Sequence, residues 1–341
     1  MLKRLRLKDF RSFSHYDVSF EPKVNWIIGP NAVGKTNLLE AIHLVSTGRS
    51  FRTPYLRELI RHGAESFTIE ATFEKEGFEH LITIHYNDKK RLCRINNTEY
   101  GHFSPLLGHL PSTLLSPKAI ELITGSPLER RRYLNIQIAQ VDPLYVHHLM
   151  RYTRALKQRN ALLKAQSVTS IEPFEHEMAR SADILMKKRD QAIALINTEA
   201  RAALGSLSTK GETIALNYKP SLPLDGDLTK TLATMRHREL KARISLYGPH
   251  RDDFEIHLND KVAKSFGSEG QKRTVAAALK FAEWGVMEKK MGGALFCCDD
   301  FGVQLDKQRT EALASALSAF DQALVTAPYE TGLVGHEIKL A

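Results

Sequence analysis

One eight-residue segment near the N-terminus constrains the fold of this chain more than any other. It reads Gly29-Pro30-Asn31-Ala32-Val33-Gly34-Lys35-Thr36 and fits the pattern G-x-x-x-x-G-K-[ST] at every position. An apolar run at 24–28 precedes it, and a helical pattern at 37–42 follows it. The segment therefore lies between a strand and a helix, which is the context that a phosphate-binding loop requires.

The residue types in this loop indicate nucleotide binding. Its glycines let backbone N–H groups converge on phosphate oxygens, and the start of the following helix adds a partial positive charge. Lys35 is placed to neutralise the β- and γ-phosphates, and Thr36 offers a hydroxyl to magnesium. We therefore predict that ATP and Mg²⁺ are the cofactors. Residues 29–36, with Asn37 directly after them, are the predicted nucleotide contacts.

A second, acidic element completes the expected site. Asp299 and Asp300 follow the apolar run Leu295-Phe296-Cys297-Cys298, which has the pattern of a buried strand. Asp299 is predicted to hold magnesium through its water shell, and Asp300 to orient or deprotonate the attacking water. The alternative is a pair of carboxylates in a solvated loop. The two cysteines are expected to be small buried hydrophobes.

Composition places the chain among globular proteins with more than one lobe. Of its 341 residues, 43% are hydrophobic, and the net charge of +9 favours polyanionic partners such as nucleic acid or anionic lipid. Three cysteines, two of them adjacent, form neither a disulfide framework nor a zinc spacing, which fits a reducing compartment. Since no secretory segment and no long apolar run is visible, we expect a soluble cytoplasmic protein.

The apolar pattern changes along the chain. After the phosphate loop it alternates, which predicts an antiparallel β-lobe with strands at 67–73, 81–86 and 92–95. From about 126 to 205 the period is helical and predicts two helices joined by a turn at 166–170. A short helical arm is therefore expected after the β-lobe.

The last part of the chain returns to strands and helices. A polar connector at 205–229, with room for a strand at 214–218, leads to a strand at 254–258 and an amphipathic helix at 269–288. Lys35 and Asp299 are 299 − 35 = 264 positions apart, much further than in compact P-loop kinases, so both ends of the chain are expected to build one nucleotide-binding head. The expected parts are 1–125 (head), 126–240 (helical arm with its connector) and 241–341 (head).

The segment in front of the two aspartates resembles a known signature. Residues 266–274 (FGSEGQKRT) are similar to the signature motif of ABC-type ATPases and, more closely, to the FGSxGQxRT form of the RecF family of DNA-repair ATPases. Further segments match that family in the same order: 7–13 (LKDFRSF), 47–52 (TGRSFR), 126–132 (SPLERRR) and 248–253 (GPHRDD). The resemblance spans essentially the whole chain.

The resemblance implies an α/β fold: an ABC-type P-loop ATPase head with an antiparallel β-lobe and a short helical arm domain, related to SMC heads. Two such heads close face to face on two ATP molecules. Ser268, with Gly270 and Gln271, would then act on the γ-phosphate held by Lys35 of the other subunit, and a helix start at Ser268 favours that role. Arg11 would approach the phosphates or, alternatively, cover an edge strand.

The resemblance also implies a function in DNA repair. In this family the ATP-controlled homodimer forms a groove for gapped DNA and, with RecR and RecO, favours loading of RecA on single strands. Hydrolysis is expected to be weak, DNA-stimulated and to act as a switch, at the nucleoid. The alternatives are the nucleotide-binding subunit of a membrane transporter and a P-loop small-molecule kinase, because the phosphate loop is common to all three.

Three places in the sequence, comprising five residues in all, depart from the family pattern. Glu269 stands where the family has glutamine, and a carboxylate beside a triphosphate is repulsive unless it points away. Val303-Gln304 replaces the usual pair before Leu305-Asp306, a loop expected to cross the dimer interface or, at Asp306, to cap the next helix. Thr326-Ala327 lacks a histidine or second threonine as γ-phosphate sensor. These departures predict weak closure or slow hydrolysis.

Basic residues gather in two runs. Residues 118–164 hold nine Lys or Arg against three Asp or Glu, and residues 230–251 hold six against one. Such runs are either solvated helix faces or surfaces for DNA phosphates. No base-reading motif accompanies them, so we expect binding without base sequence preference. The candidate DNA contacts are Arg131, Arg132, Arg151, Arg154, Lys157, Arg159 and Lys241.

Overall fold

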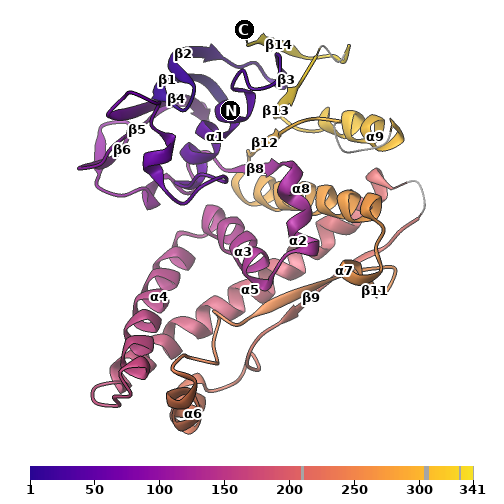
Figure 1. The fold of residues 1–341 in the computed structure, drawn as a ribbon. Coiled ribbons are helices and arrows are strands. Elements are labelled where there is room, and N and C mark those ends of the chain that lie inside the picture. The colour runs from indigo at the N-terminus through magenta and orange to yellow at the C-terminus, as the bar shows by residue number, and fades with distance from the viewer. Residues whose placement is uncertain (209–210, 303–306, 330–331, 341) are drawn as a thin grey trace. The chain divides into compact units, whose positions relative to one another are not determined.

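The contacts within the chain divide it into two compact units. The computed structural model describes residues 1–208, 211–302, 307–329 and 332–340 (Figure 1). The first unit comprises Met1–Ile120, Glu199–Glu212 and Ser268–Ala341, and the second comprises Glu121–Thr198 and Thr213–Gly267.

A parallel sheet joins the two ends of the chain in the first unit. Its strand order is β14 (His336–Lys339), β3 (Lys23–Ile28), β13 (Gln322–Ala327), β12 (Leu295–Cys298) and β8 (Ser112–Leu115). All four neighbouring pairs are parallel, with Val325 opposite Trp26 and Cys298 opposite Val325. Every residue of β12 and β13 is buried, as expected for a parallel sheet covered on both faces.

A second, antiparallel sheet forms the predicted β-lobe. Its order is β2 (Phe13–Ser19), β1 (Leu2–Phe10), β4 (Ser66–Lys75), β5 (Phe78–Asn87), β6 (Arg91–Ile95) and β7 (Thr98–Tyr100). The alternation at 67–73, 81–86 and 92–95 therefore predicts β4, β5 and β6 correctly. The N-terminal strands β1 and β2 belong to the same sheet, so the lobe continues directly into the turn beside the phosphate loop.

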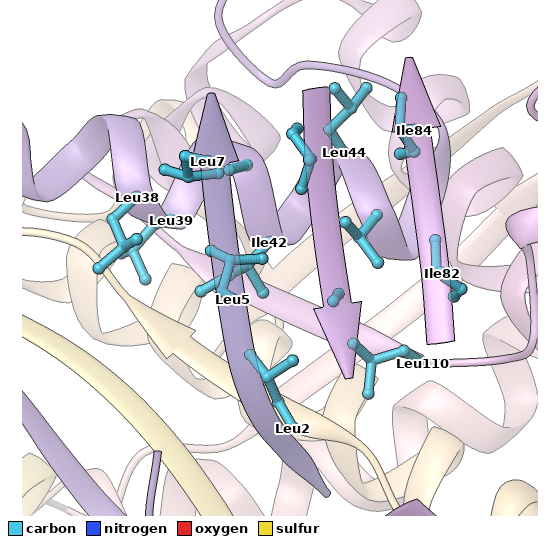
Figure 2. Close-up of a cluster of buried hydrophobic side chains, with 14 of the residues drawn as sticks. Leu2, Leu5, Leu7, Leu38, Leu39, Ile42, Leu44, Ile82, Ile84 and Leu110 are labelled. Atoms are coloured by element: carbon cyan, nitrogen blue, oxygen red, sulfur yellow. The ribbon is translucent and has the colours of Figure 1, made fainter. Parts of the chain in front are cut away.

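The core of this lobe lies between the sheet and α1 (Lys35–Thr47) (Figure 2). Leu38 and Ile42 of α1 pack in one buried cluster with Leu5 of β1 and Ile84 of β5. A register shift between Leu2 and Arg4 lets Leu2 and Leu5, three positions apart, both face this core. Each fully buried leucine contributes about 1.5–3 kcal/mol, so the cluster fixes α1, and the loop before it, on the sheet.

Two further helices complete the first unit. The predicted amphipathic helix at 269–288 is α8 (Glu269–Met291), which begins at a Ser268 cap and ends at Gly292, whose φ of 64° suits glycine. α9 (Lys307–Leu317) follows β12. Short 3₁₀ segments occur at Leu56–Leu59, Ser104–Leu106 and Pro117–Ile120.

The second unit is mainly helical. Its elements are α2 (Glu121–Thr124), α3 (Pro127–Val141), α4 (Pro143–Lys164), α5 (Glu172–Leu207, with its last turns in the first unit), α6 (Leu228–Ala242) and α7 (Ala263–Phe266). The turn predicted at 166–170 lies between α4 and α5. Asp142 ends α3 and caps α4, where its carboxylate accepts a hydrogen bond from the Leu144 amide at 3.0 Å.

A small sheet extends this unit beyond the expected arm of residues 126–240. The strand considered at 214–218 is β9 (Ile214–Lys219), and it pairs with β10 (Asp253–Leu258) over six residues, with β11 (Lys261–Val262) on the other side of β10. The second unit therefore runs to Gly267, because β10 must accompany its partner β9. Among the described residues, no helix is long and apolar enough to cross a bilayer.

A buried cluster of charges lies among the helices of the second unit. Arg159 of α4 has no exposed surface, and its guanidinium contacts Glu175 at 2.9 Å, Glu239 at 2.6 Å and the Ser245 hydroxyl at 2.7 Å. Arg236 contacts the other oxygen of Glu175 at 2.6 Å. The prediction of Arg159 as a DNA contact is therefore wrong, because its side chain is enclosed and occupied by two carboxylates.

We expect Arg159→Met to lower the free energy of unfolding by about 3–5 kcal/mol, since it leaves buried carboxylates without their cation. Urea unfolding followed by helical circular dichroism measures this. Arg154→Met is the matched control: Arg154 is exposed on the same helix, and its loss should change stability by less than about 0.5 kcal/mol. Equal effects of the two substitutions would contradict the assignment.

Candidate nucleotide site

The phosphate loop has a backbone that only its glycines allow. Gly34 lies at φ 118°, and a Cβ there would come within 2.8 Å of the Phe13 ring. A Cβ on Gly29 would come within 2.5 Å of the Leu340 carbonyl oxygen. None of the described side chains caps the start of α1, so its first N–H groups point into the loop without a side-chain acceptor. This geometry is that of an anion-binding helix start.

Lys35 lies inside the loop rather than in solvent. Its side chain is buried, and Nζ donates hydrogen bonds to the carbonyl oxygens of Gly29 at 2.6 Å and Pro30 at 2.8 Å. These are carbonyls of the loop itself, so the ammonium is held where the loop curves round. An anion entering the loop meets this positive charge directly.

The predicted magnesium residues lie side by side. The Thr36 hydroxyl is 3.0 Å from Oδ1 and 3.1 Å from Oδ2 of Asp299, although the two residues are 263 positions apart. The Thr326 hydroxyl donates to Oδ1 of the same carboxylate at 2.9 Å. Burial raises the pKa of Asp299, and the neighbouring Asp300 carboxylate raises it further. A carboxylate in this position favours a cation.

Asp300 continues from the same strand end. Its amide donates to the Thr326 hydroxyl at 2.8 Å, and its φ of 58° turns the chain sharply after Asp299. Thr326 thus contacts both aspartates, a role that the sequence analysis did not assign to it. The solvated-loop alternative for the pair is wrong for Asp299, which is buried, while Asp300 is partly exposed.

These residues border one cavity of about 700 Å³, a size that suits a nucleotide. Both aspartates and five residues of the phosphate loop region line it, which places the predicted acidic and phosphate-binding groups in a single site. The lining residues are Asn31, Ala32, Gly34, Lys35, Thr36, Asn37, Phe51, Arg52, Ser116, Pro117, Lys118, Asp299, Asp300 and Pro328.

Arg11 does not line this cavity, contrary to the expectation that it approaches the phosphates. Its guanidinium makes two bonds to the buried Glu40 carboxylate, at 2.9 and 2.8 Å, and a third to the Glu58 carbonyl at 2.7 Å. Arg52, which the sequence analysis did not single out, lines the cavity instead. Its segment, 47–52, is one of those that carry the family resemblance, and this was the available signal.

The signature segment begins α8 with a capping box. The Ser268 hydroxyl accepts from the Gln271 amide at 3.3 Å, and the Gln271 side chain accepts from the Ser268 amide at 2.8 Å. Glu269 is exposed and lies 3.4 Å from Lys272. Neither Ser268, Gly270 nor Gln271 lines the cavity of its own chain. The predicted loop Leu305-Asp306, with Val303-Gln304, lies outside the described residues.

The remaining predicted DNA contacts differ in their surroundings. Arg131 is half-buried and donates to the Asp252 carbonyl at 2.8 Å, and Arg151 forms an ion pair with Glu177 at 2.5 Å. Four residues of the predicted set are exposed on the second unit: Arg132, Arg154, Lys157 and Lys241.

Two other features of the sequence have structural explanations. In the turn at 248–253, Asp252 is buried and accepts from Arg189 at 2.9 Å. His250 is 2.6 Å from the Tyr152 hydroxyl, and burial lowers its pKa to about 4. The cysteines are buried thiols as predicted, and burial raises the pKa of Cys297 to about 12.

Comparison with known proteins identifies relatives of this chain. The family model described as "RecF/RecN/SMC N terminal domain" matches residues 1–333. A DNA replication and repair protein RecF of Protochlamydia amoebophila is 41% identical over 334 residues, covering 95% of this chain and 93% of the relative. The chain belongs to the RecF family. A RecF of Halalkalibacterium halodurans is 33% identical, covering 97% of this chain and 94% of the relative.

Solved structures agree with the RecF assignment. A structure described as the recombination mediator protein RecF bound to ATP in the RecFOR pathway has a TM-score of 0.92 at 29% identity, covering 99% of this chain and 95% of that one. An SMC head domain from Pyrococcus furiosus has a TM-score of 0.57 at 18% identity, covering 96% and 89%, and shares the fold. The expected α/β fold, an ABC-type ATPase head with a β-lobe and a helical arm, is confirmed.

We expect Asp299→Asn to stabilise the nucleotide-free chain while impairing the predicted nucleotide site. Burial penalises the ionised carboxylate, so its neutral isostere should raise the melting temperature by about 2 °C, as roughly 1 kcal/mol does in a domain of this size. ATP hydrolysis should fall about a hundredfold, because the carboxylate predicted to hold magnesium is lost.

The size of this stability difference depends on pH. As the pH falls through the raised pKa of Asp299, the parent carboxylate becomes neutral too, so the advantage of the variant should shrink. Thermal melting across a pH series and a phosphate-release assay measure both effects. Asp321→Asn, at an exposed carboxylate, should change neither. A lower melting temperature for Asp299→Asn at neutral pH would contradict the burial argument.

Proposed function

We propose that this chain is an ATP-dependent DNA-binding repair protein of RecF type. The observation that carries the proposal is the contact of Thr36 with Asp299 at 3.0 Å, inside the cavity that the phosphate loop borders. A hydroxyl and a buried carboxylate whose pKa is raised by burial form a suitable donor set for Mg²⁺. When bound, this ion neutralises phosphate oxygens of the nucleotide.

The residues of the chain divide the remaining tasks. The N–H groups at the start of α1 and the Lys35 ammonium bind the phosphates, and Thr326 fixes the orientation of Asp299 through its hydroxyl. Asp300, at the edge of the cavity, orients or deprotonates the attacking water. An aspartate reaches one methylene less far than a glutamate, which supports slow hydrolysis that serves as a switch.

ATP binding closes two copies of the chain face to face. Ser268 starts a helix of 23 residues, whose positive end suits the γ-phosphate bound by the partner, and it is exposed. Its capping box with Gln271 fixes the backbone of the first turn, and therefore the directions of its N–H groups. Glu269 lies 3.4 Å from the Lys272 ammonium, which offsets part of its negative charge at this face.

The dimer binds gapped DNA without base sequence preference and acts with RecR and RecO to favour loading of RecA, in the cytoplasm at the nucleoid. The description of the similar solved structure as a recombination mediator of the RecFOR pathway supports this role. Exposed Arg132, Arg154, Lys157 and Lys241 supply the charge that would meet DNA phosphates.

Sedimentation with and without Mg·ATP tests the switch. The parent chain should shift from monomer to dimer with ATP and should bind gapped duplex DNA only then. Lys35→Met should abolish both, because the phosphates lose their cation. Ser268→Arg should still bind ATP but stay monomeric, since it places a bulky cation at the helix start. A parent chain that binds ATP yet remains monomeric and ignores DNA would overturn the proposal.

Salt dependence tests the DNA surface. Each phosphate contact contributes about one unit to the slope of log affinity against log salt, so the double variant Arg154→Gln with Lys157→Gln should lower the slope by about 2. Lys187→Gln is the matched control, because Lys187 is exposed but paired with Asp183 at 2.8 Å. Fluorescence anisotropy at several salt concentrations measures the slopes. An unchanged slope in the double variant would remove these residues from the DNA interface.

A further inference from the structure

A buried carboxylate beside the phosphate loop has no role in the proposed chemistry. Glu40 lies in the second turn of α1, five positions after Lys35, and has no exposed surface. Arg11 donates to its Oε2 at 2.9 Å and to its Oε1 at 2.8 Å. The Ser50 hydroxyl donates to Oε1, and Arg52 donates to Oε2 at 3.3 Å. One negative charge therefore serves two arginines from different loops.

The two arginines share this carboxylate unequally. Arg11 makes two short bonds to it and a third to the Glu58 carbonyl, and only 17% of its side chain is exposed. Arg52 has one long contact with Glu40 and one bond of 2.7 Å to Asn37, and 41% of its side chain is exposed. Glu40 thus pairs closely with Arg11, while Arg52 is held less tightly, and its charge also acts on Asp299 across the cavity that both residues line.

Glu40 also fixes the backbone that carries Arg52. The Ser50 hydroxyl, which donates to Glu40, accepts from the amides of Arg52 at 2.9 Å and Thr53 at 3.1 Å. Asn37, the other partner of Arg52, donates to the Ser12 hydroxyl at 2.9 Å. The guanidinium at the cavity is therefore held through both its side chain and its loop, which reduces the freedom that it would lose on meeting an anion.

We propose that Glu40 is a positioning residue for nucleotide binding: it saturates Arg11 and holds Arg52 at the cavity, so that Arg52 supplies a cation to the phosphates. This inference rests on the proposed ATP-binding function. It distinguishes two arginines that the sequence alone does not separate, and it gives Arg11 a structural task.

Paired substitution separates position from charge. Glu40→Met with Arg11→Met removes one negative and one positive charge, so the net charge beside the cavity stays the same. Because both members of the Glu40–Arg11 ion pair are replaced, neither is left buried without the other. Any change in nucleotide affinity then reports the placement of Arg52. Equilibrium titration with a fluorescent ATP analogue and Mg²⁺ measures affinity, and a thermal melt verifies that the variant is folded.

A thermodynamic cycle with Arg52→Met gives the decisive result. In the parent, Arg52→Met should weaken ATP binding about tenfold, whereas in the paired variant, itself about five- to tenfold weaker, it should cost less than about twofold. An equal cost of Arg52→Met in both backgrounds, or parental affinity in the paired variant, would overturn the inference.

Two further variants protect this test. Asp9→Asn breaks the ion pair of Asp9 with Arg61, at 2.8 Å in the adjoining turn, and should leave ATP affinity unchanged. If the paired variant does not fold, Glu40→Asp replaces it, because this substitution keeps the negative charge but shortens the side chain. In the Glu40→Asp background, the loss of ATP affinity caused by Arg52→Met should be at least threefold smaller than in the parent. An equal loss of affinity rejects the inference. If the parent binds no ATP, the proposed function fails as well, whereas ATP binding without coupling rejects the role of Glu40 alone.

Discussion

The parallel pairing of β3 with β13 is the contact on which the nucleotide site depends. It sets Ile28, the last residue before the phosphate loop, opposite Ala327, and so places Thr326 beside the loop. Because β12 pairs with β13 in the same direction, Asp299 emerges at the same edge of the sheet. The loop brings Thr36 to that edge. A single register between strands almost three hundred residues apart thus determines which hydroxyls meet the carboxylate.

Two buried charges of this molecule, Arg159 and Asp299, have contrasting surroundings. Arg159 is surrounded by carboxylates that satisfy it, and its environment is complete within the chain. Asp299 is bonded by two hydroxyls, but these are neutral donors, and burial raises its pKa. The ion pairs of Arg159 are structural. The buried charge of Asp299 would instead be stabilised by a bound cation, which is the property expected of a binding site.

The local sequence was sufficient to predict those parts of the candidate site that are formed by contiguous residues. The phosphate loop, the helix start at Ser268 and the strand before Asp299 each have a periodicity or motif within ten positions. Arg159 could not be sorted from Arg154 in this way, because its partners Glu175 and Glu239 are 16 and 80 positions away. Likewise, the different surroundings of Arg11 and Arg52 depend on Glu40, whose burial becomes visible only once both loops are folded.

The position of β14 has a consequence for the order in which parts of the fold can form during synthesis. β3 and the phosphate loop are translated long before their neighbours β13 and β14, which begin only at Gln322 and His336. Until then Trp26 and Ile27 have no sheet to join, and Gly29 lacks the chain at Leu340 that packs over it. A nascent or prematurely terminated chain therefore contains the complete motif but lacks the strands that pack beside the loop. The motif alone is therefore not sufficient to form the supported loop, because the supporting contacts come from β13 and from the chain at Leu340.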